Sequence, residues 1–88
     1  MILNDTNKTK VLRELKKMYN RTIERSKNAE IFFKTKTVAE CLRYLNLFNE
    51  ITQELGKLIF LIEYITGQEL DYEIKMNGFK EVRNERNK

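Results

Sequence analysis

The stretch that decides the fold lies at residues 58–65 and reads Leu58-Ile59-Phe60-Leu61-Ile62-Glu63-Tyr64-Ile65. Seven of these eight side chains are apolar, so a helix formed here is apolar nearly all round. A helix with one apolar stripe needs one partner, whereas a helix that is apolar all round has to be enclosed. A chain of 88 residues has few other elements with which to enclose it. The stretch therefore predicts self-association or a bound protein partner; the alternative is that the chain's own short third helix covers the rest of it in a monomer.

This stretch ends a long helical pattern that begins at a capping box. In Thr37-Val38-Ala39-Glu40, the threonine and the glutamate have the spacing at which each side chain satisfies a free amide at a helix start. Apolar residues follow at intervals of three and four, and the last five keep the rhythm of a bundle seam: Ile51, Leu55, Leu58, Ile62 and Ile65. The pattern predicts a helix of about 28 residues, with Gly56 as the point where it is weakened or kinked.

A first helix is predicted before this one. It follows the polar cluster at residues 4–7, any of which can cap it. Val11, Leu15 and Met18 then recur at helical spacing and place an apolar stripe on one face. The pattern fades beyond residue 31 and stops at residues 34–37, where we expect the chain to turn back.

A third, short helix is predicted after residue 66. Residues 66–69 are a second capping-box candidate, with Thr66 as the cap. Gly78, in a left-handed conformation, is expected to end the helix, with Phe79 contacting Ile74. Residues 1–7 are expected to be flexible, and residues 80–88, nearly all charged or Asn, to fray. The chain is thus predicted to be one all-α domain of 88 residues, a small bundle of two long antiparallel helices and a short third, completed by homodimerisation.

The composition excludes several classes of function. Cys41 is the only cysteine and there is no histidine, so the sequence indicates no disulfide, no metal site and no proton shuttle near neutral pH. We expect no secretory signal, and residues 58–65 are far fewer than the ~20 that cross a bilayer. These features predict a cytoplasmic, non-enzymatic protein with no cofactor, no membrane contact and no implied small molecule. The richness in Asn, Lys and Ile fits an AT-rich bacterial or phage genome.

Charge is segregated along the chain. Residues 1–44 hold eleven Lys and Arg against five acids, whereas residues 45–73 hold one against six. The basic residues of the first helix form one face. If the first two helices form a hairpin, Lys17 and Arg21 of this face lie beside Glu50 and Glu54. The face is then solvated, and its charge is balanced by the chain's own acids. Alternatively, this basic face contacts the phosphates of a nucleic acid or binds an acidic protein. The residues of such a contact are Lys10, Arg13, Lys17, Arg21 and Lys27, with Arg83 and Arg86 in the tail.

One short motif follows the long helix. Gly67-Gln68-Glu69-Leu70-Asp71 resembles the Ser-Gln-Glu-Leu-Asp motif of the small helical-hairpin phosphatases that dephosphorylate the sporulation response regulator. In that family the motif begins the second helix and acts on an aspartyl phosphate. The resemblance covers about eight residues, has Gly67 at the serine position, and would make Gln68 and Asp71 the candidate site residues. The alternative interpretation is an ordinary helix start with acids near its N-terminal dipole.

The sequence favours a small protein–protein interaction module, an adaptor, inhibitor or regulator that forms a homodimer or binds a host or partner protein. Its alternative is a nucleic-acid-binding accessory protein that uses the basic face of the first helix and the C-terminal tail. The residues predicted to carry association are Leu55, Leu58, Ile59, Phe60, Leu61, Ile62 and Ile65.

Overall fold

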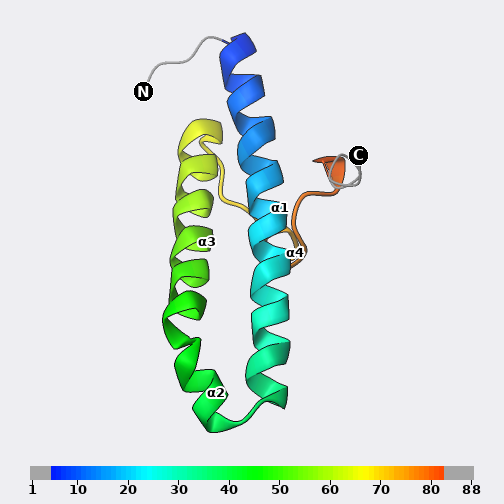
Figure 1. Ribbon diagram of the computed structural model, residues 1–88. Coiled ribbons are helices and arrows are strands. Elements are labelled where there is room, and N and C mark those ends of the chain that lie inside the picture. The colour runs from blue at the N-terminus through cyan, green and yellow to red at the C-terminus, as the bar shows by residue number, and fades with distance from the viewer. Residues whose placement is uncertain (1–4, 83–88) are drawn as a thin grey trace.

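In the computed structural model, which describes residues 5–82, the protein is all-α, and those residues form no strand. The helices are α1 (Asp5–Thr35), α2 (Val38–Arg43), α3 (Leu45–Thr66) and α4 (Tyr72–Asn77). The long helices α1 and α3 pack side by side in opposite directions, α2 forms the turn between them, and α4 packs against α1 (Figure 1). The predicted all-α class and the packing of two long helices are therefore confirmed. Within residues 5–82, no helix is both long enough and apolar enough to cross a membrane.

The second predicted helix is interrupted, but at Tyr44 and not at Gly56. The Thr37 cap is confirmed, since its hydroxyl oxygen accepts a hydrogen bond from the Glu40 amide at 3.2 Å. Helix α2 then ends at Arg43, and the backbone of the next residue, Tyr44, is not helical, with φ of −105° and ψ of 10°. The Tyr44 ring lies edge-on to Phe32 of α1, with the centroids 5.2 Å apart. Gly56 lies inside the continuous helix α3, so the break coincides with aromatic packing rather than with a helix-breaking residue.

The start of the short third helix also differs from the prediction. Gly67 has a left-handed conformation (φ 70°, ψ 15°) that ends α3, so Thr66 is the last residue of that helix and not a cap. Asp71 is the cap of α4, and its carboxylate accepts a hydrogen bond from the Ile74 amide at 2.9 Å. The predicted cap at Thr66 is wrong because glycine adopts a positive φ easily and ends the preceding helix there.

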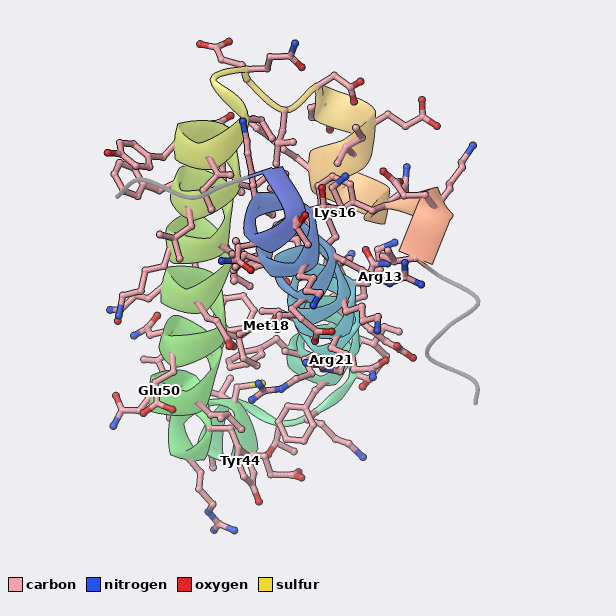
Figure 2. The ribbon with its side chains drawn as sticks, turned by 90° about the horizontal axis from the view of Figure 1, so that it is seen from above. Arg13, Lys16, Met18, Arg21, Tyr44 and Glu50 are labelled. Carbon is pink, nitrogen blue, oxygen red and sulfur yellow. The ribbon has the colours of Figure 1, made fainter. Side chains whose placement is uncertain are left out.

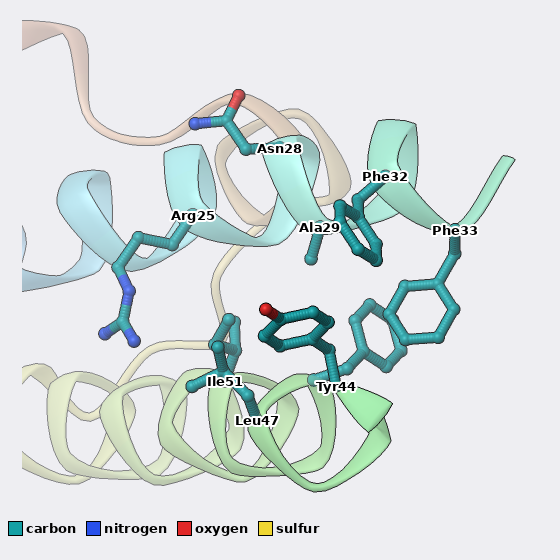
Figure 3. Close-up of a pocket in the computed structure, with 9 residues that line it drawn as sticks. Arg25, Asn28, Ala29, Phe32, Phe33, Tyr44, Leu47 and Ile51 are labelled. Carbon is teal, nitrogen blue, oxygen red and sulfur yellow. The ribbon is translucent and has the colours of Figure 1, made fainter. Parts of the chain in front are cut away.

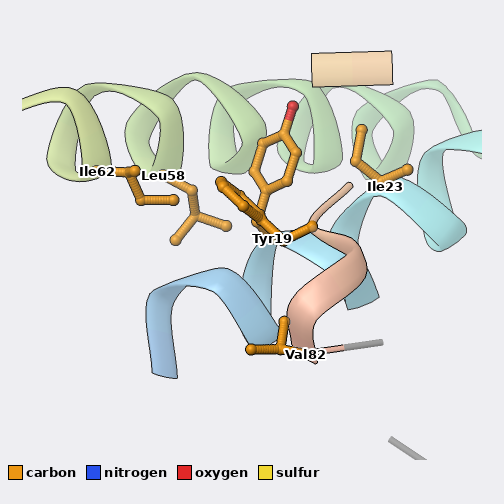
Figure 4. Close-up of a cluster of buried hydrophobic side chains, with 6 residues drawn as sticks. Tyr19, Ile23, Leu58, Ile62 and Val82 are labelled. Carbon is orange, nitrogen blue, oxygen red and sulfur yellow. The ribbon is translucent and has the colours of Figure 1, made fainter. Parts of the chain in front are cut away.

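The core joins three segments that are distant in the sequence. Helix α1, helix α3 and the segment after α4 contribute two buried side chains each: Tyr19, Ile23, Leu58, Ile62, Phe79 and Val82. Figure 4 shows this cluster between the helices. Tyr19 and Ile62 are almost inaccessible to solvent, and the Tyr19 and Phe79 rings meet edge to face at 5.7 Å. The enclosure of residues 58–65 thus comes in part from the chain's own C-terminal segment.

Parts of both terminal segments have regular structure. Asp5 begins α1, so residues 5–7 are helical. Residues 80–82 form a turn of 3₁₀ helix, with Val82 buried and Glu81 paired with Lys16 at 3.2 Å. The Lys16 ammonium also lies 5.3 Å from the centre of the Phe79 ring. The rest of the predicted tail, residues 83–88 with Arg83 and Arg86, lies outside the described residues, as do residues 1–4.

A buried amide holds the C-terminal segment on α1. The Asn20 side chain accepts a hydrogen bond from the Phe79 amide at 2.7 Å and donates one to the Phe79 carbonyl at 2.9 Å. Gly78 has a positive φ of 86° with ψ of −173°, so its φ agrees with the predicted helix stop while its ψ is extended. A Cβ on Gly78 would overlap the Asn20 side-chain oxygen. We call this arrangement of Asn20, Gly78 and Phe79 the Asn20 latch.

Two glycine substitutions are expected to change stability in opposite directions. Gly78→Ala should lower the free energy of unfolding by about 1–3 kcal/mol, because alanine is strained at positive φ and its methyl group meets Asn20. Gly56→Ala should raise it by up to about 1 kcal/mol, because Gly56 is helical and has free space around its Cα. Urea unfolding of both variants measures the difference. Equal changes in the free energy of unfolding of the two variants would contradict the geometry of the Asn20 latch.

Burial of Tyr19 predicts a loss of stability at high pH. The Tyr19 hydroxyl donates a hydrogen bond to the Lys75 carbonyl at 2.7 Å, and burial raises its pKa from about 10 to about 12. Between these pH values the unfolded chain releases the phenolic proton and the folded chain keeps it. The Tyr19 contribution is therefore complete below about pH 10 and is lost as the pH rises to about 12.

Unfolding curves of the wild type and Tyr19→Phe between these pH values test the shift. The free energy of unfolding should fall more steeply with pH in the wild type, since both proteins share their other titrating groups. Parallel pH profiles would contradict the raised pKa of Tyr19.

Candidate functional site

The residues predicted to carry association divide into two groups in the structure. Leu58 and Ile62 belong to the core, and Leu55 and Ile59 pack against it, so α1 and the C-terminal segment already cover them. Ile65 is half-buried. Phe60 and Leu61 remain exposed, and these two are the part of the set that is free for a partner.

Phe60 and Leu61 share the outer face of α3 with Tyr64. Each residue turns a helix by about 100°, so Phe60, two positions from both Leu58 and Ile62, points away from the core. Phe60 is 65% exposed and Tyr64 59%, while Leu61 is 36% exposed. The two rings stack with their centroids 6.1 Å apart and their planes 19° from parallel. We call Phe60, Leu61 and Tyr64 the outer patch; Tyr64 was not predicted, although its i+4 spacing from Phe60 was visible.

A second apolar region is the cavity between α1 and α3 beside α2. Its volume is about 340 Å³, and Figure 3 shows the side chains that surround it. The apolar and aromatic part of its wall comes from α1, from α3 and from Tyr44 between α2 and α3: Ala29, Phe32, Phe33, Tyr44, Leu47, Phe48 and Ile51. The Phe33 and Phe48 rings in this wall lie 5.0 Å apart at 54°. We call this space the end cavity.

The polar groups of the end cavity are few. Among the described residues that line it, Arg25 is the only charged one. A guanidinium nitrogen of Arg25 lies 3.5 Å from the Glu54 carboxylate, with both side chains partly exposed. In Figure 3 the Tyr44 hydroxyl points into the space between the helices, and it makes no hydrogen bond to a described residue. This cavity was not predicted from the sequence, although its aromatic residues flank the predicted turn and a hairpin brings such positions together.

The predicted basic residues of α1 are mostly on its exposed side. Lys10, Arg13, Arg21 and Lys27 are exposed, and Lys17 is half-buried and pairs with Glu14 of its own helix at 3.5 Å. Figure 2 shows Arg13 and Arg21 on α1, apart from Glu50 on α3. Within residues 5–82, no ion pair joins Arg21 to Glu50 or Glu54, and it is Arg25 that pairs with Glu54. Acids of the chain therefore do pair with this helix, but through Lys17 with Glu14 and Arg25 with Glu54.

The motif at residues 67–71 lies in the connection between α3 and α4. Gly67 ends α3, Gln68 is exposed, and the Asp71 carboxylate is used as the cap of α4. The Leu70 amide donates a hydrogen bond to Glu63 at 2.9 Å, which ties the connection to α3. The helix that follows the motif, α4, has six residues. These contacts account for the motif as a helix boundary.

Two apolar regions and one basic face thus remain as candidate sites on this helical hairpin. Comparison with protein-family models, with curated proteins and with solved structures finds no match, so the assignment of a function depends on these surfaces alone.

Proposed function

We propose that the protein is a small non-enzymatic interaction module of the cytoplasm, an adaptor, inhibitor or regulator that associates through the outer patch of α3. The observation that carries this proposal is the stacked pair of Phe60 and Tyr64, both more than half exposed on one helix face. Contiguous exposed apolar side chains of this kind are typical of protein contacts, and aromatic residues are enriched in the centres of interfaces.

The partner that best fits the outer patch is a second copy of the chain. In an antiparallel crossing of two α3 helices centred between Phe60 and Leu61, position 57 of one copy faces position 64 of the other. The exposed Lys57 ammonium can then lie over the partner's Tyr64 ring, a favourable cation–π contact that occurs twice by symmetry. Such self-complementarity is the property that a two-fold interface requires.

The size of the outer patch indicates a weak dimer. An aromatic side chain has an area of 150–250 Å², so Phe60 and Tyr64 each expose roughly 100–150 Å². With Leu61, the patch offers about 300 Å² per copy, well below the ~800 Å² per partner of a stable interface. We therefore expect a dissociation constant of roughly 10 µM to 1 mM, with neighbouring residues of α3 extending the contact.

Sedimentation of the purified chain tests the dimer. The wild type should change from monomer to dimer between about 10 µM and 1 mM, and Phe60→Asp should remain a monomer because a carboxylate would be buried without a partner. Tyr72→Asp is the control, since Tyr72 is an exposed aromatic residue that belongs to α4 and not to α3. A wild-type protein that stays monomeric at 1 mM, or a Phe60→Asp variant that still dimerises, would contradict the proposal.

The second candidate is contact with a nucleic-acid backbone through α1. It is favoured by the exposure of Lys10, Arg13 and Arg21 and by the separation of Arg21 from the acids of α3. Fluorescence anisotropy with labelled duplex DNA should then show affinity falling steeply between about 50 and 200 mM salt, with a log–log slope of about −0.9 per phosphate contacted. Arg13→Glu with Arg21→Glu should abolish binding, and Lys57→Glu on α3 should not. Equal DNA affinity in the double variant and the control would eliminate this candidate.

A further inference from the structure

We propose that the end cavity binds a small aromatic carboxylate, with its ring among Phe33, Tyr44 and Phe48 and its carboxylate at Arg25. This site is separate from the outer patch and extends beyond the proposed function. The sequence implied no small molecule, because the cavity exists only where α1 and the α2–α3 segment come together.

The apolar walls of the end cavity indicate that the main part of the ligand is an aromatic ring system. Its volume of about 340 Å³ lies within the range of small-molecule pockets, which are mostly apolar with a few polar groups. The cavity is open to solvent on the side of Tyr44 and Leu47, both 45% exposed, and its apolar walls offer water few hydrogen-bond partners. The Phe33 and Phe48 rings are tilted by 54° and leave aromatic edges and faces for another ring. A ligand with one or two fused rings suits this space.

The polar groups of the end cavity select the charge of the ligand. Arg25 is a permanent cation with five N–H donors, a geometry that matches a carboxylate. Its contact with Glu54 is long, at 3.5 Å, and partly exposed on both sides, so the pair is weak and leaves donors available. The Tyr44 hydroxyl supplies another donor on the cavity side (Figure 3). The wall residues therefore complement an anion, not a cation.

Binding in the end cavity does not depend on dimerisation. Ile51 and Phe48 line the cavity, and Phe48 packs on Phe33 of α1, so this part of α3 faces α1. Phe60 and Tyr64 lie on the outer face of the same helix. Phe60→Asp should therefore keep its ligand affinity while losing any dimer, and the two proposals fail or succeed separately.

Titration of the full chain with 2-naphthoate, followed by ¹H–¹⁵N NMR spectra, tests the site. The amides of residues 25–33 and 44–51 should shift, and 2-naphthoate should bind at least tenfold more tightly than the neutral 2-naphthalenemethanol. Arg25→Gln should reduce naphthoate affinity about tenfold and leave the alcohol unchanged. Arg21→Gln is the matched control, because Arg21 lies one turn earlier on α1 and does not line the cavity.

Several outcomes would overturn this inference. Shifts confined to the basic face of α1 would show a surface anion contact only, and shifts confined to the outer patch would show an apolar surface contact only. Equal affinities for the acid and the alcohol, or equal effects of the two arginine variants, would exclude recognition of the carboxylate by Arg25. If circular dichroism shows that Arg25→Gln does not fold, the acid–alcohol comparison and the map of shifts in the wild type decide the question.

Discussion

Replacing Ile62 by alanine is expected to lower the free energy of unfolding by about 2–5 kcal/mol. Ile62 has no solvent-accessible surface and lies in the cluster that joins α1, α3 and the C-terminal segment. The substitution removes apolar contacts and leaves a cavity that the surrounding helices can fill only partly. Single domains have a total stability of about 5–15 kcal/mol, so this loss brings a chain of 88 residues close to unfolding.

The matched control for Ile62→Ala is Phe60→Ala, two positions earlier on the same helix. Phe60 is 65% exposed, so its truncation should change the free energy of unfolding of the monomer by about 0.5 kcal/mol or less. Urea unfolding followed by circular dichroism, at a concentration low enough to exclude association, measures both values. A larger loss for Phe60→Ala than for Ile62→Ala would mean that the inner and outer faces of α3 are assigned the wrong way round.

Asn20→Ala is expected to have the second large effect, a loss of about 2–5 kcal/mol. The substitution removes both partners of the buried Phe79 backbone, whose amide and carbonyl each bond to the Asn20 side chain. A buried group left without its hydrogen bond costs about 1–3 kcal/mol. Phe79 also packs on Tyr19, so a weakened latch exposes aromatic surface as well.

Asn28→Ala is the control for the Asn20 latch. Asn28 lies on the same helix but is exposed, so both variants share the gain of roughly half a kcal/mol that alanine brings to a helix. The difference between them isolates the latch. Hydrogen exchange at the Phe79 amide adds a local readout and should accelerate in Asn20→Ala alone. Equal stability of the two variants, with unchanged exchange at Phe79, would contradict the proposed role of Asn20.

The regular parts of this fold were predictable because they depend on local spacing. The three- and four-residue intervals from Ile51 to Ile65 gave α3 its inner face, and Thr37 with Glu40 gave α2 its cap. The candidate site was predictable in part. Phe60 and Leu61 are exposed as partner contact requires, but Leu58 and Ile62 are used by the core.

Other features were not predictable because they depend on contacts between distant residues. A tail rich in charge looks frayed when each residue is considered alone, yet Val82 is buried and Phe79 is held by Asn20, 59 positions earlier. The break at Tyr44 has no glycine or proline to mark it and coincides with packing on Phe32. The end cavity arises in the same way, from side chains of two helices that meet only in the folded chain.

The sequence by itself determined that this protein is a helical hairpin with more apolar surface than one helix can cover, because helix formation follows the chain's own periodicity. The tertiary structure decided which part of that apolar surface is buried. Closing the C-terminal segment onto α1 buries the inner face of α3 and leaves the outer patch and the end cavity open. Burial is a property of neighbours in space, and periodicity does not specify which neighbours the chain brings together.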